Sequence, residues 1–336
     1  MGEILKIMNN ELSNLESKGI FAAIILLVSV CWSTIAVSQT YRAGQHVEPA
    51  FEGWRPNPDG SFNMMFGYMN ENWEETPDVS VGDENFFAPG DADRGQPTHF
   101  LPRRNRFTFE VTVPSDWGER ELVWTLKANG VERKAYATLK SDYLVDNMVI
   151  ASETGSLGAG TSSPESRANI PPVVTVQGDN IRVARVAEPL NLQTLVADDG
   201  LPEPSDPVET ARVFAEFAGG ALAAAFITET NVLQRRMMSP PVKPTVDKVN
   251  GLYYSWNKWR GPGEVTFDPQ QVKVWEDTRT SANSPWGALF LPPPIPEDGI
   301  YEVNATFSEP GEYLLWGRAD DGGLYQDAWI TVNVSE

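Results

Sequence analysis

The chain has 336 residues, which suggests two domains, and its 41% hydrophobic content gives each half enough apolar surface for a core. With 26 Lys and Arg against 46 Asp and Glu, the net charge of −20 excludes the basic surface that nucleic-acid binding requires. Two histidines and one cysteine exclude a disulfide framework and a Cys-rich or multi-histidine metal centre.

The N-terminal segment is apolar. Residues 20–30 (IFAAIILLVSV) form an uninterrupted apolar run, and Ala36-Val37-Ser38 offers small residues for cleavage. Such a run followed by small residues is typical of a secretory signal peptide. We therefore predict a signal peptide over residues 1–38, with an uncleaved membrane anchor as the alternative and a lipoprotein signal at Cys31 as a weaker one. Once this leader is removed, the exported part contains no cysteine.

Residues 39–150 are predicted to form a β-sandwich. Between Arg106 and Val113, apolar and polar residues alternate, which places the apolar side chains on one face of a strand. Leu122–Leu126 repeats this alternation, and the following Ala128-Asn129-Gly130 is typical of a hairpin turn because Asn and Gly tolerate positive φ. Short strands separated by turns favour a sandwich.

Residues 151–169 are predicted to be a flexible linker. The segment is rich in Ser, Gly and Ala and poor in large apolar side chains. It therefore buries too little surface to offset the entropy lost on ordering.

Residues 170–336 are predicted to form a second β domain. A β-branched strand opens it at 171–176, and a hairpin over 311–334 closes it. Within the long insertion at 201–250, residues 208–238 are Ala-rich, which favours a helical or partly helical excursion. Residues 285–298 contain three consecutive prolines and are expected to form an extended surface loop.

The first half carries a long run of motifs in a fixed order. These are FGYMNEN at 66–72, DRGQPTHFLP at 93–102 and LVWTL at 122–126. Over residues 50–140 this order resembles a β-sandwich module found in exported bacterial proteins. The resemblance implies an extracellular, immunoglobulin-like module and implies no catalytic residues.

The second half resembles PKD-type and other bacterial immunoglobulin-like domains. The motifs that carry this resemblance are PPVV at 171–174, ADDG at 197–200, PGEY at 310–313 and ADDGG at 319–323. Tyr313 suits a tyrosine corner, and Trp256 suits the core position of a central strand. We therefore expect an all-β fold of two immunoglobulin-like β-sandwich domains, the second with a long partly helical or irregular insertion.

Two acidic turns are candidate metal sites. The carboxylates of Asp198 and Asp199, and those of Asp320 and Asp321, could bind calcium if both turns lie at the same end of the sandwich. The alternative is that Asp and Gly are simply good turn formers. Apart from possible calcium, the sequence suggests no cofactor.

Two aromatic residues are candidates for a ligand site. Trp256 and Trp259 are three residues apart, so they point to opposite faces of a strand, and Tyr253 shares the face of Trp259. If Tyr253 and Trp259 are exposed, their rings could stack on sugars. The alternative is that they pack against a loop or the other domain.

No catalytic arrangement stands out. His99 has no accompanying Gly-x-Ser-x-Gly motif, and pairs of carboxylates are uninformative among so many acidic residues. We expect a non-enzymatic binding or structural module that is periplasmic, on the cell surface or extracellular. A carbohydrate-binding accessory protein is one alternative, and a carboxylate-based hydrolase is a less favoured one. The expected partner is an unknown protein or polysaccharide, not nucleic acid, and membrane contact is expected only through an uncleaved N-terminal segment.

Overall fold

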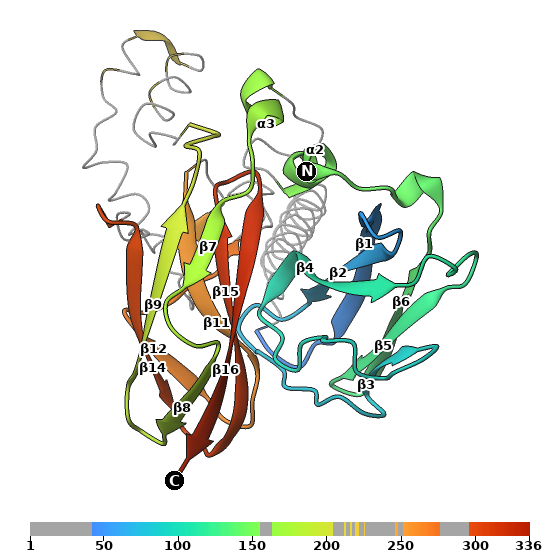
Figure 1. Ribbon diagram of the computed structural model, residues 1–336, viewed down its shortest axis with the longest axis horizontal. Helices are drawn as coiled ribbons and strands as arrows, with labels where there is room; N and C mark the ends of the chain where they lie inside the picture. The colour runs from blue at the N-terminus through green and yellow to red at the C-terminus, as the bar shows by residue number, and fades with distance from the viewer. Residues whose placement is uncertain are drawn as a thin grey trace, which may run out of the picture. The chain divides into compact units, whose positions relative to one another are not determined.

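The computed structural model describes the chain from residue 42 onward, with gaps (Figure 1). The described ranges are 42–154, 163–203, 246–247, 251–275 and 296–336, with isolated residues at 212, 216, 219–221 and 225. The predicted leader at 1–38 lies outside the described residues, as do the middle of the predicted linker, most of the insertion and most of the proline-rich loop. In the part of the chain that is described, no helix is long and apolar enough to cross a membrane.

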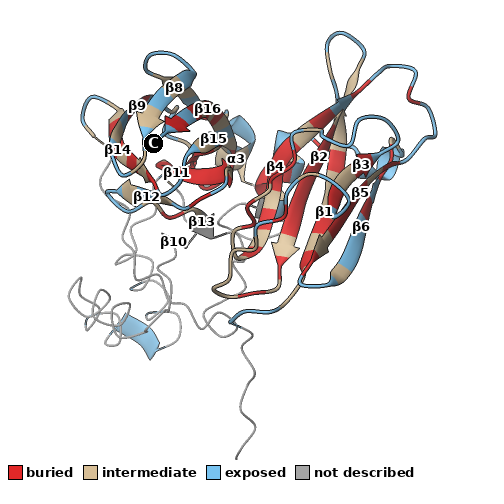
Figure 2. Ribbon diagram, turned by 90° about the horizontal axis from the view of Figure 1, so that it is seen from below, coloured by how far each residue is buried: buried red, intermediate tan, exposed pale blue. Residues whose placement is uncertain are grey.

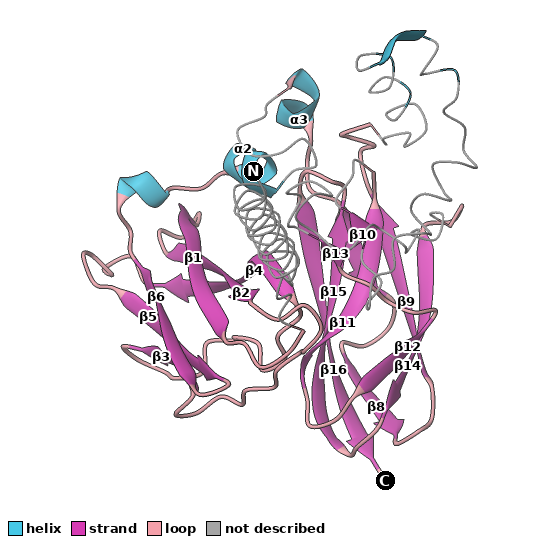
Figure 3. Cartoon of the chain, turned by 180° about the vertical axis from the view of Figure 1, so that it is seen from behind, coloured by secondary structure: helices cyan, strands magenta, loops and turns pink. Residues whose placement is uncertain are grey.

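The first sandwich contains two three-stranded antiparallel sheets (Figure 3). One sheet has the order β1-β2-β4 and the other β3-β5-β6. Their bounds are β1 Val47–Pro56, β2 Phe62–Asn70, β3 Asn85–Ala88, β4 Arg103–Val113, β5 Leu122–Ala128 and β6 Val131–Ala137. In immunoglobulin terms this is an ABE sheet facing a CFG sheet, and no strand D occurs within residues 42–154.

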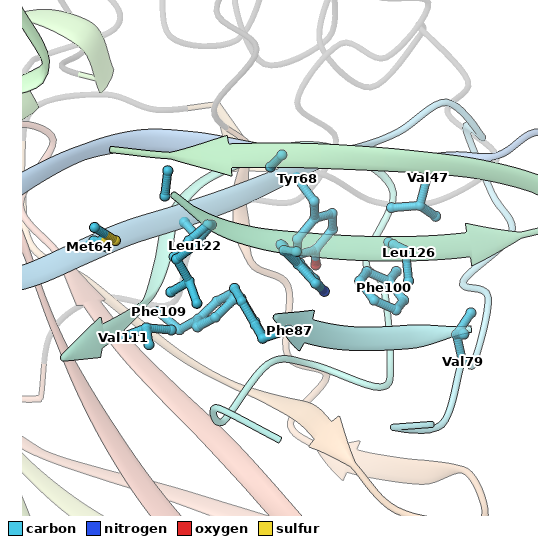
Figure 4. Packing of buried hydrophobic residues seen from close by; sticks show 14 of the residues in the cluster. Val47, Met64, Tyr68, Val79, Phe87, Phe100, Phe109, Val111, Leu122 and Leu126 are labelled. Carbon is cyan, nitrogen blue, oxygen red and sulfur yellow. The ribbon is translucent and has the colours of Figure 1, made fainter. Parts of the chain in front are cut away.

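Aromatic rings fill the core of the first sandwich, and several of them are labelled in Figure 4. Phe87 stacks on Trp124 with ring centroids 5.7 Å apart, and Phe66 meets Phe87 edge to face at 5.1 Å. The buried Trp124 donates from Nε1 to Asn85 Oδ1 at 2.9 Å, so its polar atom is satisfied. Such rings supply most of the buried apolar area of a small domain.

Strand β4 departs from the predicted alternation at Phe107. The register between β2 and β4 shifts at this point, and Phe107 has a φ of +47°. The residue opposite the bulge, Gly67, must be a glycine, because a Cβ at this position would clash with the Asn105 carbonyl. The resulting bulge turns Phe107 away from Phe109 and the core. It joins a separate cluster on the outer face of the sheet, made up of Met65, Val145, Ile150, Ala151 and Leu324.

The second sandwich contains two four-stranded sheets. One has the order β12-β14-β9-β7 and the other β11-β15-β16-β8, with antiparallel neighbours except for the parallel pair β16 and β8. Their bounds are β7 Val173–Val176, β8 Ile181–Arg185, β9 Leu190–Ala197, β11 Tyr253–Arg260, β12 Val265–Asp268, β14 Ile300–Phe307, β15 Gly311–Asp320 and β16 Tyr325–Ser335. This order is DEBA and CFGA′, the immunoglobulin topology, so the all-β immunoglobulin-like fold is confirmed. A short parallel pair, β10 Val246–Asp247 with β13 Val274–Trp275, lies outside both sheets.

Two core features of the second sandwich match the sequence predictions. The Tyr313 hydroxyl donates to the Glu309 carbonyl at 2.9 Å and accepts from the Gly263 amide at 3.0 Å, which forms a tyrosine corner. Trp256 on β11 is fully buried in the core. Figure 2 shows the buried residues concentrated on the strands of both sandwiches.

The predicted linker at 151–169 is partly helical. The helix α2 (Asn147–Thr154) enters it and α3 (Pro164–Ala168) lies near its end; a 3₁₀ turn, η1 (Ser141–Tyr143), precedes both. Ala151 is buried because it packs on the outer face of the first sandwich, and Ser163 begins α3 with a capping box. The expectation of a flexible segment is therefore corrected at both ends, while 155–162 lie outside the described residues.

Candidate functional site

Strand β11 joins the two sandwiches through Trp259. As the spacing predicts, Trp256 and Trp259 occupy opposite faces of the strand, and Trp259 belongs to the core cluster of the first sandwich. Its ring centroid lies 5.9 Å from that of Phe109, 5.2 Å from that of Trp316 and 5.0 Å from that of Trp329. Tryptophans of the second sandwich thus complete the core of the first.

The DRGQPTHF motif forms the loop that receives β11. Arg260 donates two hydrogen bonds to the Asp93 carboxylate at 2.7 and 2.9 Å, and these bonds hold the pKa of Asp93 below its usual value. Trp259 donates from Nε1 to the Gly95 carbonyl at 3.0 Å. The backbone amides of residues 98–99 donate to the Trp259 carbonyl at 3.1 and 3.2 Å. The motif, which the sequence left without a role, is a docking loop for the second sandwich.

A histidine, a carboxylate and a lysine form a second contact between the sandwiches. His99 Nδ1 lies 2.9 Å from Asp78 Oδ1, and Lys258 Nζ on β11 lies 3.2 Å from the same oxygen. Burial opposes ionisation of Asp78, but His99 and Lys258 outweigh it and lower the pKa of this carboxyl. Lys258 also donates to the Gly263 carbonyl at 3.1 Å. His99 is therefore a structural residue of the interface.

Arg318 on β15 holds the bulged strand β4. Its guanidinium is buried, stacks between Trp316 and Tyr325 at 4.7 and 3.8 Å from their centroids, and donates twice to Asp327 at 2.7 and 2.8 Å. It also donates to the Phe107 carbonyl at 2.6 Å. The bulge that reverses Phe107 therefore presents a backbone acceptor to the second sandwich.

A groove of about 770 Å³ lies between the sandwiches. The first sandwich contributes Arg55 from β1, Glu110 from β4 and Arg94 from the docking loop. The second contributes Asp327 and Trp329 from β16. Glu110 is paired with Arg55 and Asp327 with the buried Arg318, while Arg94 donates to the Asp91 carbonyl.

The predicted calcium ligands stabilise their own turns. Asp198 accepts from the Gly200 amide at 3.0 Å, and Asp320 accepts from the Gly322 amide at 2.8 Å. Asp199 accepts from the Ile170 amide at 3.2 Å, which ties this turn to the start of the second sandwich. Within the described ranges, no three His, Cys, Asp or Glu side chains are grouped so as to hold a metal ion.

Asp321 is fully buried, and Asp320 beside it is 3% exposed. Asp321 Oδ1 accepts from the amides of residues 323–324 at 2.6 and 2.7 Å, while burial raises the pKa of Asp321 to about 7. Asn169, also buried, lies beside it, and a Cβ on Gly323 would be 2.9 Å from Asn169 Nδ2 and 3.6 Å from Pro202 Cδ. Pro202 follows the turn that contains Asp198 and Asp199, and Asn169 precedes Ile170, whose amide donates to Asp199. Both therefore bring that turn close to Gly323, so the two acidic turns lie at the same end of the second sandwich.

The candidate ligand residues Tyr253 and Trp259 are buried. Tyr253 is 7% exposed and donates from its hydroxyl to the Val272 carbonyl at 2.7 Å. Trp259 is 1% exposed because it fills the space between the sandwiches. The alternative, packing against the other domain, describes Trp259.

Comparisons with known proteins give only distant likenesses. No family model matches the sequence, and no curated protein matches it. Similar solved structures include the S-layer protein SbsC, with 7% identity and a TM-score of 0.23 over 87% of this chain and 28% of that chain. They also include the fibronectin(III)-like modules of Clostridium thermocellum CbhA (10% identity, TM-score 0.20, 86% of this chain and 94% of that chain) and the Yersinia pseudotuberculosis adhesin InvE (8% identity, TM-score 0.20, 88% and 61%). At such TM-scores the fold assignment rests on the strand order itself.

Proposed function

We propose that the chain is a non-enzymatic structural module of an exported bacterial protein, in which two immunoglobulin-like sandwiches act as one rigid unit. The observation that carries this proposal is the burial of Trp259, a residue of the second sandwich, in the core of the first. A relative movement of the sandwiches would expose this ring and break the bonds of the docking loop. A rigid pair suits a spacer or platform that holds other surfaces at a fixed separation.

The sequence supports export. The apolar run at 20–30 is typical of a leader, and the one cysteine, Cys31, lies close behind it. The rest of the chain therefore folds without disulfide bonds, which is compatible with an oxidising exterior. The proposed location is the envelope or the exterior of the cell.

The hydrolase alternative requires two carboxylates free to act on a substrate. The groove holds Glu110 and Asp327, but both are engaged. Glu110 accepts from Arg55 and from Asn63, each at 2.5 Å. Asp327 accepts from Arg318 and from Trp316 Nε1. These contacts favour a structural role for both acids.

Calorimetry of the full chain tests the proposal. We expect a single unfolding transition, because the first sandwich shares its core with the second. Leu192→Ala, in the core of the second sandwich alone, should lower the whole transition by removing buried methyl groups. Tyr136→Ala is the control, since this ring is 55% exposed on β6 and should leave the transition unchanged. If Leu192→Ala splits the transition and the first sandwich keeps its original melting temperature, the sandwiches are independent and the proposal is wrong.

A further inference from the structure

The groove between the sandwiches combines an aromatic ring with half-exposed charged groups. Trp329 is partly exposed, and its ring stacks on Trp316 at 18° with centroids 6.2 Å apart and meets Trp259 edge to face. Two further tryptophans thus hold the ring in one orientation before any ligand arrives. Preorganisation of this kind reduces the entropy lost on binding.

The opposite wall offers hydrogen-bonding groups. The Arg55 side chain is 42% exposed, and within the described residues its guanidinium donates only from Nη2, to Glu110. A guanidinium carries five N–H donors, so others remain for a ligand. The Glu110 side chain is 26% exposed, and each of its oxygens already accepts one hydrogen bond, from Arg55 or from Asn63. A carboxylate oxygen has two lone pairs, so each can accept a second bond from a ligand hydroxyl. A hydroxyl both donates and accepts, so a ligand rich in hydroxyl groups matches a paired guanidinium and carboxylate.

The charge of the chain selects against anionic ligands. In the groove Arg55 pairs with Glu110, Asp327 is paired with the buried Arg318, and Arg94 donates to a backbone carbonyl, while the whole chain carries a charge of −20. A phosphorylated or acidic polymer would therefore be repelled at long range. A neutral ligand with an apolar ring face and many hydroxyls satisfies all of these conditions.

We propose that this groove binds a neutral oligosaccharide, with a sugar ring against Trp329 and its hydroxyls hydrogen-bonded to Arg55 and Glu110. Clefts between domains that combine aromatic side chains with a few convergent polar groups are common ligand sites. This function goes beyond the structural role proposed above and makes use of it, because the two walls belong to different sandwiches. The carbohydrate site that the sequence suggested at Tyr253 and Trp259 is thus proposed instead at Trp329, the partly exposed neighbour of Trp259.

The test is binding of the full chain to an array of cello-, xylo-, manno- and chito-hexaoses, followed by calorimetric titration with the strongest binder. We expect Trp329→Ala to weaken binding by at least ~10-fold, equivalent to about 1.4 kcal/mol, and Arg55→Gln to weaken it by a similar factor. Trp329→Phe should retain part of the affinity because it keeps a ring. Tyr136→Ala, an exposed aromatic far along the chain from the groove residues, should bind like the unmodified protein.

Arg55→Gln guards against misfolding, since it removes a half-exposed charge and should melt close to the unmodified chain. Failure of all four hexaoses to bind the unmodified chain would overturn the groove proposal while leaving the single unfolding transition intact. Equal binding by folded Trp329→Ala and Arg55→Gln would place the ligand elsewhere and also overturn it. Release of shorter sugars would support the groove but contradict the non-enzymatic function.

Discussion

The two sandwiches differ in how they complete their cores. Among the described residues, every member of the second core comes from the second sandwich itself, within residues 174–334. The first core includes Trp259 and Trp316, which belong to the second sandwich, and Leu314 and Trp329 pack against it. The first sandwich therefore depends on the second, whereas the second has a complete core of its own.

Topology explains this asymmetry. The second sandwich has eight strands in two sheets, while the first has six and lacks strand D within its described range. A smaller sandwich leaves more of its apolar side chains at the edge and on the outer face. Burying those side chains against a larger neighbour is a substitute for the missing strand.

Trp259→Ala should have the largest effect and should fall on the first sandwich. Removing a fully buried Trp costs about 3–5 kcal/mol, because the cavity left behind does not collapse completely. Native-state hydrogen exchange should show faster exchange on β5 and β6 while β9 and β14 keep their protection. Trp256→Ala is the matched control: it lies in the second core and should accelerate exchange in both sandwiches. Unchanged exchange on β5 in Trp259→Ala would show that the first core is self-sufficient.

The sequence predicted those features that depend on neighbours along the chain. Alternation at Leu122–Leu126, the Asn129-Gly130 turn with both residues at positive φ, and the tyrosine corner at Tyr313 are local, and all were found. The burial of Trp259 depends on Gly95 and Phe109, more than a hundred residues away, so its spacing predicted a face but not the partner. For the same reason the reversal of Phe107 was missed. The outer face of the β1-β2-β4 sheet can carry the apolar Phe107 because Leu324 and helix α2 cover it, and these contacts lie far away along the chain.

Asp321→Asn should change the pH dependence of the second sandwich. Burial raises the pKa of Asp321 to about 7 from its ordinary value of 3.8, so the folded state binds more protons than the unfolded state between these pH values. Stability from this group is full below pH 4 and falls as pH rises to 7, by at most about 1.4 kcal/mol per pH unit. Asn resembles the protonated acid, so urea unfolding of the variant between pH 4 and 8 should show a flatter profile. An equally steep decline in the variant would assign the pH dependence to other groups.

Calcium tests whether the two acidic turns of the second sandwich bind a metal ion. If they do, millimolar calcium raises the melting temperature at pH 8, since a ligand bound only by the folded state stabilises by about 2.7 kcal/mol at one hundred times its dissociation constant. Asp320→Ala should abolish the rise. The effect should be smaller at pH 5, where Asp321 is protonated. Equal melting temperatures with and without calcium at pH 8 would reject the site at Asp198, Asp199, Asp320 and Asp321.

The Asp93–Arg260 pair should make the smallest contribution. The two side chains are 53% and 24% exposed, and pairs of this kind couple by about 0.2–1 kcal/mol in double-mutant cycles. Arg260→Ala alone should cost more than Asp93→Ala alone, because Arg260 also donates to the Gln96 carbonyl at 2.8 Å. The coupling, from urea unfolding of both single variants and the double variant, should shrink at 1 M salt. Lys127–Glu84, an exposed pair within the first sandwich, is the control for salt. A larger coupling that survives salt would make this ion pair, and not Trp259, the main link on which the first sandwich depends.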